Sequence, residues 1–272
     1  MKLAMIQMLV EPGAVKKNLD HAGDLIKQAA AQGADCALLP EMLDTGWCHG
    51  SCHKHAGPIP GGDSCAALSE AAREHGILVC AGISERDGQN IYNSAVLIGR
   101  AGRLLVHHRK LNELDIGHHL YAQGDRLGVT RIPEGNIGVM ICADATAREG
   151  VLAKSLGYMG ADIILSPSAW AVRPDHDNIR EPYGRTWTEA YGQVCRDFRL
   201  WIAGVSNVGP VTEGAWAGWN CIGSSIAVGP DGEQVVQSPY GADAEAVLYV
   251  QIQPEPRPAR GNAWHGFWQG KT

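Results

Sequence analysis

The sequence has little of what a membrane protein or a nucleic-acid-binding protein requires. None of its apolar runs reaches the roughly 18 residues of a membrane-spanning helix. Its formal net charge is −6 and its pI is near 6.0, with no run of Lys and Arg. Proteins that hold phosphate backbones or anionic lipid surfaces carry the opposite charge balance. The sequence therefore predicts no nucleic-acid partner and no membrane partner.

Signals for export and for disulfide bonds are also missing. The first residues, Met1–Gln7, follow a strand pattern and lack the three regions of a signal peptide. The eight cysteines are scattered, and Cys36, Cys80 and Cys142 fall in apolar runs, where reduced buried thiols are common. We therefore expect a cytoplasmic protein with reduced thiols.

Nucleotide and metal motifs are absent as well. The glycine-rich stretches match neither a phosphate loop nor a dinucleotide-binding fingerprint. The segment Cys48–His55 groups two cysteines with three histidines, but a structural zinc site usually needs a second set of ligands after a longer loop. The sequence offers no such second set. We expect no metal and interpret this segment as a polar loop beside an active site.

What the sequence does contain is an alternation of strand-like and helix-like segments. Its hydrophobic fraction of 45% and charged fraction of 19% are typical of an ordered core. No linker or low-complexity block interrupts the pattern, so we predict a single domain over 1–272 with an extended tail over about 254–272. Helices are predicted at Val15–Ala29, Asp63–His75, Thr146–Tyr158 and Glu181–Phe198, and strands at Lys2–Met8, Asp35–Leu39, Ile77–Ile83, Asn93–Ile98, Leu104–His108, Ile137–Ile141, Asp162–Leu165, Leu200–Val205, Cys221–Val228, Gln234–Gln237 and Ala246–Ile252.

Three reactive side chains each follow directly on a strand-like run. They are Glu41, Lys110 and Cys142. The ends of strands form the edge of an α/β sheet where ligands collect. Cys142 also precedes a predicted helix, whose positive end would favour the thiolate. Taken singly, each residue has an ordinary structural explanation, since a cysteine after apolar residues usually belongs to the core.

Together with their flanking residues, these side chains resemble the nitrilase (carbon–nitrogen hydrolase) superfamily, in its amidase-like branch. The resemblance covers nearly the whole chain and implies an α/β fold of four αββα layers, with two mixed β-sheets flanked by helices. It also implies assembly into a homodimer or a higher homo-oligomer. Six motifs occur in the order and approximate spacing of the family: Leu39-Pro40-Glu41-Met42, Tyr92-Asn93-Ser94-Ala95, Arg109-Lys110-Leu111, Gly138-Val139-Met140-Ile141-Cys142-Ala143-Asp144, Ser166-Pro167-Ser168-Ala169-Trp170 and Ser206-Asn207-Val208-Gly209.

The resemblance implies a role for each of the three reactive residues. Attack on an amide or nitrile carbon requires a thiolate, a base and a positive donor for the developing oxyanion. Cys142 is the implied nucleophile, Glu41 the general base and acid, and Lys110 the stabiliser of charge. The backbone N–H of Ala143 is the implied second oxyanion donor. No metal or organic cofactor is needed, and the three side chains are expected to titrate as a coupled unit.

Two parts of the sequence depart from the family pattern. Many members carry a second Glu seven residues before a glycine that follows the lysine, but that count from Gly124 reaches Gly117. We interpret Glu113 as a possible auxiliary acid, with a surface loop residue as the alternative. After the nucleophile, Ala143 replaces a common aromatic residue. Glu149 keeps the family's residue type and is expected to fix the start of the next helix.

The substrate pocket should draw on the loops that follow these strands. Trp170 is the strongest candidate contact, because a Trp beside a cleft supplies a flat apolar wall and one N–H donor. Ala169 precedes it, Trp47 is placed on the opposite wall, and His118 is a candidate for tuning local charge.

These features predict a cysteine-dependent amidohydrolase. It would cleave a C–N bond of a small linear amide through a thioester acyl-enzyme and release ammonia or an amine. Hydrolysis of an N-carbamoyl amide or of a nitrile by the same triad remains an alternative, although nitrilases often carry Trp where this chain has Ala143. An alternative outside catalysis is a silent sensor or scaffold with the same fold.

Overall fold

The structure, a computed structural model, describes residues 1–256. Alternation along its first strand shows how the layers form. In β1 (Lys2–Gln7), Leu3 and Met5 join the core cluster that both sheets share. Ala4 and Ile6 point the other way and pack with helical residues in a second core cluster. The strand is therefore buried on both faces, as a central strand of a layered α/β fold must be.

The first sheet has the strand order β15-β1-β2-β3-β4-β5. Its central strands β1, β2 and β3 are parallel, and antiparallel neighbours extend it on both sides. The strands β2 and β5 run in the same direction, so their carboxyl ends lie at one edge of the sheet. The remaining bounds are β2 Cys36–Leu38, β3 Leu78–Asp87, β4 Asn90–Ile98, β5 Leu104–Arg109 and β15 Ala246–Gln251.

The second sheet has the order β14-β13-β10-β8-β7-β6 and faces the first. Its central strands β7, β8 and β10 are parallel. A small third sheet of β11, β12 and β9 lies beyond the carboxyl ends of β8 and β10. The bounds are β6 Gly128–Ile132, β7 Gly135–Val139, β8 Ile163–Ser168, β9 Ala171–Val172, β10 Trp201–Ser206, β11 Val208–Pro210, β12 Asn220–Ile222, β13 Ile226–Val228 and β14 Gln234–Gln237.

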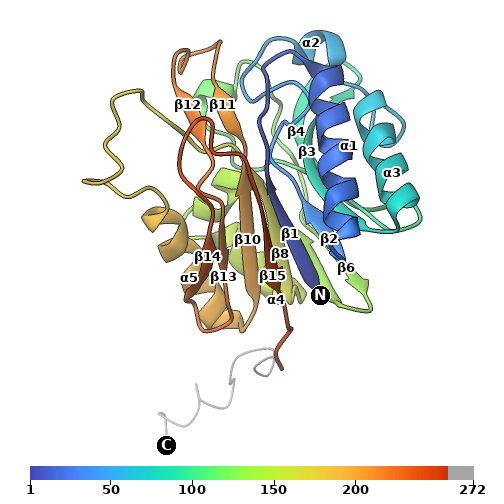
Figure 1. Cartoon of the computed structure of the whole chain (residues 1–272), viewed down its shortest axis with the longest axis vertical. Helices are drawn as coiled ribbons and strands as arrows, with labels where there is room; N and C mark the ends of the chain where they lie inside the picture. The colour runs from blue at the N-terminus through green and yellow to red at the C-terminus, as the bar shows by residue number, and fades with distance from the viewer. Residues whose placement is uncertain (257–272) are drawn as a thin grey trace, which may run out of the picture.

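Two pairs of helices cover the outer faces of the sheets (Figure 1). The helices α1 (Val15–Ala31) and α3 (Asp63–His75) lie side by side on the first sheet, and α4 (Val151–Met159) and α5 (Arg185–Phe198) lie on the second. A short helix, α2 (Cys52–His55), precedes α3. The predicted αββα sandwich of two mixed sheets is confirmed.

The start of α4 differs from the prediction. The sequence predicted a helix from Thr146, but residues Cys142–Thr146 form a short 3₁₀ helix and α4 begins at Val151. Between them Arg148 and Glu149 adopt positive φ angles of 34° and 60°. Glu149 is exposed, and no side chain caps α4, so its predicted role at the helix start is wrong.

Other differences concern short or polar elements. The helix predicted from Glu181 begins at Arg185, just after Gly184, and the strands β6, β9 and β11 and the helix α2 have no counterpart in the prediction. Within residues 1–256, no helix is long and apolar enough to cross a membrane. The predicted tail over 254–272 lies almost entirely outside the described residues.

Candidate active site

The three predicted residues lie at the carboxyl ends of strands in the two facing sheets. Glu41 follows β2 and Lys110 follows β5 in the first sheet, and Cys142 follows β7 in the second. A backbone hydrogen bond of 3.1 Å from the N–H of Glu41 to the carbonyl of Ser168 joins the two sheets at this edge. The structure therefore brings together side chains that are far apart in the sequence.

The turn that carries Glu41 is fitted closely against β3. Gly82 of β3 donates its N–H to the carbonyl of Pro40 at 2.9 Å and accepts from the N–H of Leu43 at 2.9 Å. A Cβ at Gly82 would lie 2.5 Å from the Cα of Glu41, so no larger residue fits there. Met42, directly after Glu41, has a φ of 50°, a left-handed conformation that surrounding contacts must hold.

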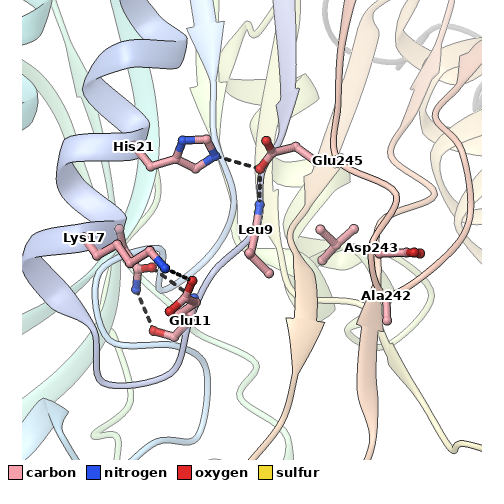
Figure 2. A pocket seen from close by; sticks show the side chains of 9 residues that line it. Leu9, Glu11, Lys17, His21, Ala242, Asp243 and Glu245 are labelled. Atoms are coloured by element: carbon pink, nitrogen blue, oxygen red, sulfur yellow. Dashed lines mark hydrogen bonds and ion pairs between the residues drawn. The ribbon is translucent and has the colours of Figure 1, made fainter.

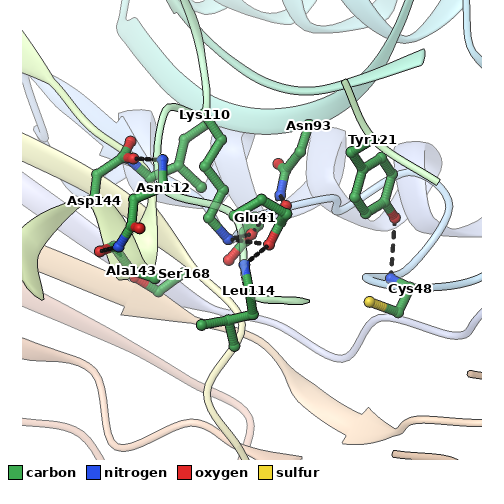
Figure 3. A network of polar contacts seen from close by, with 12 residues as sticks. Glu41, Cys48, Asn93, Lys110, Asn112, Leu114, Tyr121, Ala143, Asp144 and Ser168 are labelled. Atoms are coloured by element: carbon green, nitrogen blue, oxygen red, sulfur yellow. Dashed lines mark hydrogen bonds and ion pairs between the residues drawn. The ribbon is translucent and has the colours of Figure 1, made fainter. Parts of the chain in front are cut away.

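Four polar side chains form a closed ring of hydrogen bonds at this edge (Figure 3). The Lys110 ammonium donates to Glu41 Oε1 at 2.7 Å and to Glu113 Oε1 at 2.9 Å. The amide of Asn93 donates to the same Glu41 oxygen at 2.6 Å and to Glu113 Oε2 at 2.8 Å. All four side chains are nearly inaccessible to water. One ammonium and one amide thus hold two carboxylates side by side.

In many family members a second Glu stands where this chain has Gly117. Here the side chain of Glu113 fills the space beside Gly117. A Cβ at Gly117 would lie 2.9 Å from Cγ and 3.0 Å from Cδ of Glu113. The Glu113 carboxylate is held by Lys110, by Asn93 and by its hydrogen bond from the Leu114 N–H at 2.9 Å. The structure therefore places Glu113 against the lysine rather than in a solvated loop.

Burial and mutual charge control the ionisation of this group. Burial raises the pKa of Glu41, Lys110 opposes that shift, and the charge of Glu113 adds to it. Burial alone would lower the pKa of Lys110, but Glu41, Glu113 and Cys142 outweigh it and raise the pKa well above its usual value. Lys110 therefore stays an ammonium, which two carboxylates share.

Cys142 is a buried thiol rather than a thiolate stabilised by a helix. Its side chain is buried, and the residue is 6% exposed. Burial raises the pKa of the thiol and Glu41 adds to the shift, whereas Lys110 and a hydrogen bond from the Ala169 backbone oppose it. A 3₁₀ helix of five residues begins at Cys142, whereas the longer helix predicted nearby starts only at Val151. A base is needed to ionise this thiol.

The backbone at Cys142 is held in an uncommon conformation. Its φ is 43°, in the left-handed region that costs a non-glycine residue about 1–3 kcal/mol. Asp144 accepts the N–H of Ile141 at 2.9 Å, and the carbonyl of Ala143 accepts from Asn112 Nδ2 at 2.6 Å. These contacts fix the peptides on both sides of the sulfur. Sequence reasoning gave no role to Asn93 or Asp144, although both lie in the quoted motifs as polar residues beside apolar strands.

The aromatic side chain of Trp47 lies beside the polar ring. The Lys110 ammonium lies 5.8 Å from the centre of the Trp47 ring, and Trp47 packs edge-to-face on Trp216 at 5.3 Å. Trp170 is fully buried, stacks on Trp187 at 4.8 Å, and has an indole N–H without a protein partner. Trp47 and Ala169 belong to one apolar cluster beside the site. His118 has 60% of its side chain exposed, and its Nε2 lies 3.1 Å from the carbonyl oxygen of Glu113.

We also searched the described residues for a metal site and for a cavity away from Glu41, Lys110 and Cys142. Within residues 1–256, no group of three His, Cys, Asp or Glu side chains is placed to hold a metal ion. Cys48 and Cys52 are buried free thiols, and the Cys48 N–H donates to the Tyr121 hydroxyl at 3.0 Å.

A cavity of about 400 Å³ lies between α1 and the segment before β15 (Figure 2). It is lined by Glu11, His21 and Glu245 among others, and by no predicted site residue.

Comparison with protein families agrees with this arrangement. The family model described as carbon-nitrogen hydrolase matches residues 2–259. The chain belongs to the carbon–nitrogen hydrolase family. This membership confirms the resemblance that the six motifs predicted.

Similar proteins with curated names match different shares of this chain. The chain is 30% identical to Omega-amidase NIT2 of Danio rerio over 92% of its own length and 87% of the relative. It is 36% identical to a nitrilase of Pyrococcus abyssi over 61% of its length, and this match spans 64% of the nitrilase. A match to Omega-amidase NIT2 of Xenopus tropicalis spans 63% of that protein.

Solved structures share the fold of this carbon–nitrogen hydrolase. A carbon-nitrogen hydrolase from Helicobacter pylori G27 superposes with a TM-score of 0.81 at 21% identity, over 92% of this chain and 87% of that one. An amidase from Nesterenkonia sp. superposes with a TM-score of 0.78 at 20% identity, over 94% and 91% of the two chains.

Proposed function

We propose that this protein is a cysteine-dependent amidohydrolase that cleaves the C–N bond of a small linear amide. The observation that carries the proposal is the buried ring of Glu41, Lys110 and Glu113, whose charges all act on the Cys142 thiol. A reactive thiol, a base and a fixed cation at one sheet edge are the groups that acyl transfer requires. Membership of the carbon–nitrogen hydrolase family supports the same chemistry.

The first step forms a thioester. Glu41 takes the proton of the Cys142 thiol as the sulfur attacks the amide carbonyl carbon, and the carbonyl oxygen becomes an oxyanion. Lys110 uses two of its three N–H groups on the carboxylates, which leaves the third for this oxygen, beside the backbone N–H of Ala143. The tetrahedral intermediate then expels the nitrogen, which receives the proton from Glu41 and leaves as ammonia or an amine.

The second step hydrolyses the acyl-enzyme. Glu41 takes a proton from water, the hydroxide adds to the thioester carbon, and the C–S bond breaks. The proton on Glu41 returns to the Cys142 sulfur, so the enzyme is restored and a carboxylic acid is released. The raised pKa of Glu41 suits both steps, because a carboxylate with a raised pKa is a stronger base than an ordinary one.

Glu113 acts as the auxiliary acid by position rather than by taking protons from substrate. Its charge raises the pKa of both Glu41 and Lys110. The hydrogen bond that Glu113 accepts from Lys110 holds the ammonium between two carboxylates. The third N–H of Lys110 can then point only toward the substrate oxygen. Asn93 holds the two carboxylates at a constant separation.

The proposed substrate is a small amide, for which Trp170, Ala169 and Trp47 provide the apolar wall. His118 is left out of this wall because its side chain is largely exposed. Ala143 in place of an aromatic residue favours an amide over a nitrile. N-carbamoyl compounds use the same triad and are the second candidate. We place the enzyme in the cytoplasm, where a reducing environment keeps a nucleophilic thiol free, and propose that it works as a homo-oligomer.

The test measures ammonia release from a panel of short amides, N-carbamoyl amino acids and nitriles. We expect turnover of at least one amide by the wild-type protein and none above background by Cys142→Ala. Iodoacetamide should alkylate Cys142 fastest among the eight cysteines and abolish turnover in parallel. Cys195, which is also buried, serves as the internal control. Equal alkylation of Cys142 and Cys195, or turnover by Cys142→Ala, would reject the proposal.

A further inference from the structure

The carboxylate of Asp144 connects the two segments that carry Lys110 and Cys142. Its Oδ1 accepts the N–H of Asn112 at 2.8 Å and that of Leu111 at 3.1 Å, both directly after the lysine. Its Oδ2 accepts the N–H of Ile141 at 2.9 Å, directly before the nucleophile. One fully buried side chain therefore spans the gap between the first sheet and the second at the site (Figure 3).

A fourth hydrogen bond to this carboxylate comes from His108. The ring Nε2 of His108 lies 2.8 Å from Asp144 Oδ2, and both side chains are completely buried. The other ring nitrogen, Nδ1, has no partner. An ionised carboxylate can only accept, so Nε2 is the ring nitrogen that donates to Asp144.

The state of Asp144 follows from these contacts. Burial acts to raise its pKa, but the hydrogen bond and charge of His108 and the backbone donors outweigh burial and lower the pKa. Asp144 is therefore an acceptor only, and all four of its donors find an ionised oxygen. A protonated or amide side chain would offer a donor to one of the N–H groups and break a contact.

We propose that His108 and Asp144 are positioning residues, which hold the lysine segment and the nucleophile turn in register for the reaction. Neither touches substrate. His108 fixes the rotation of the Asp144 carboxylate, and that carboxylate fixes the peptides at 111–112 and 141. A displacement of about 1 Å between reacting groups can cost 100-fold in rate. This inference rests on the proposed function, because register matters only if Lys110 and Cys142 act on one carbon.

The neighbouring residue provides a matched control. His107 precedes His108 in β5 and points to the opposite face of the sheet, where its Nε2 lies 2.7 Å from Glu85 Oε2. The two histidines lie in the same strand, β5, and one ring nitrogen of each contacts a buried carboxylate. Only the His108 contact reaches the nucleophile turn.

The experiment compares His108→Phe, His108→Leu, His108→Gln and His107→Phe. The first two remove the donor with a large and a smaller apolar side chain, so that one of them can be studied if the other overpacks the core. Gln keeps an N–H donor near the position of Nε2. For each variant, kcat and KM for the best amide, the rate constant for Cys142 alkylation by iodoacetamide, and the melting temperature are measured.

We expect the Phe and Leu variants at His108 to lose 10- to 100-fold in kcat with KM changed less than threefold. The Cys142 alkylation rate should fall with kcat, and the Gln variant should recover to within about fivefold of wild type. His107→Phe should keep the wild-type kcat and alkylation rate even where it melts earlier. Equal loss in His107→Phe, no recovery in His108→Gln, or a wild-type kcat in both apolar variants would overturn the proposal.

The alkylation rate separates this proposal from the proposed function. It is measured on the thiol itself and needs no amide turnover. If the wild-type protein hydrolyses no amide, the proposed function fails. In that case, slower alkylation of Cys142 in the His108 variants alone still shows that His108 and Asp144 position the nucleophile turn, and unchanged alkylation in them refutes this positioning.

Discussion

The ionisation of each residue in the site depends on its neighbours more than on its own chemistry. Glu41, Lys110 and Cys142 are all buried, and burial by itself disfavours every charged form. The lysine remains charged because two carboxylates surround it, whereas the thiol remains neutral because no cation outweighs its burial. In the proposed mechanism, this difference leaves Glu41 as the base that ionises the Cys142 thiol.

The charge of Glu113 should be visible in the pH dependence of activity. In the proposed mechanism Glu41 acts as a base only when ionised, so kcat/KM should rise with pH through its pKa, which lies above the ordinary value near 4.3. Glu113→Gln removes a negative charge that raises this pKa. We therefore expect the acid limb of the kcat/KM profile to move to lower pH in Glu113→Gln. An acid limb that stays in place or moves to higher pH would contradict this account.

Gly117 leaves room for the Glu113 side chain, and this space can be tested directly. Gly117→Ala places a methyl group within about 3 Å of Cγ and Cδ of Glu113, a side chain that three hydrogen bonds hold. We expect kcat to fall about 10-fold while the melting temperature changes by a few degrees at most. Gly23→Ala in α1 is the control, because nothing lies within 4 Å of its Cβ. Steady-state rates of both variants decide the matter.

At the scale of elements, Glu85 joins three strands of the first sheet. It lies in β3 and accepts hydrogen bonds from Ser94 in β4 and from His107 and Arg109 in β5. Burial acts to raise its pKa, but the hydrogen bonds from His107, Arg109 and Ser94 together lower it to about 2. Three adjacent strands thus meet on one carboxylate, and one of its donors, Arg109, directly precedes Lys110.

This depressed pKa predicts how stability depends on pH. The folded pKa of Glu85 lies below the unfolded value near 4.3, so its contribution is complete above pH 4.3 and is lost as pH falls toward 2. In urea unfolding at pH 7, Glu85→Gln should lose about 1.5–3 kcal/mol. The gap between variant and wild type should narrow as the pH falls through that window. Glu189→Gln, in an exposed pair with Arg185, is the control and should change little.

Elements with a strong apolar pattern could be predicted from the sequence, and those set by tertiary contacts could not. The helix predicted at about Asp63 to His75 is present with these bounds, because its apolar positions recur at helical spacing and Gly76 ends it. Thr146 to Gly150 has ordinary helical residues, yet Arg148 and Glu149 are left-handed there. Nothing local signals this bend, which lies between α4 and the 3₁₀ helix that Asp144 secures.

The candidate site divides in the same way. Glu41, Lys110 and Cys142 could be located from motifs, since each stands at a strand end. Glu113 could be placed only as the nearest acid, because the path of a loop is not readable from its residues. The roles of Asn93 and Asp144 emerge only from the structure, since a hydrogen bond between residues far apart in the sequence leaves no periodic trace in it.

At the scale of the molecule, large exposed apolar side chains gather on one helix. Among residues 1–256, five large hydrophobic side chains are exposed, and three of them lie on α4. They are Val151 at 46%, Tyr158 at 74% and Met159 at 48% exposed. Their spacing of seven and eight residues places them on one face of the helix. We interpret this exposed apolar face as a surface for contact with another protein chain.

We expect a second copy of this chain to cover the α4 face. A stable homodimer buries about 800 Å² per partner, and it should exclude these three side chains from water. Val151→Asp combined with Met159→Asp would bury charges in that interface, so the double variant should sediment as a monomer while the wild-type protein sediments as a dimer or larger. Val235→Asp is the control, because this residue is equally exposed, at 54%, but lies on β14. If Val235→Asp dissociates the assembly and the α4 variant does not, then the interface lies at the edge of the second sheet. A monomeric wild-type protein would show that α4 meets no second copy, and the catalytic groups of one chain would then have to suffice.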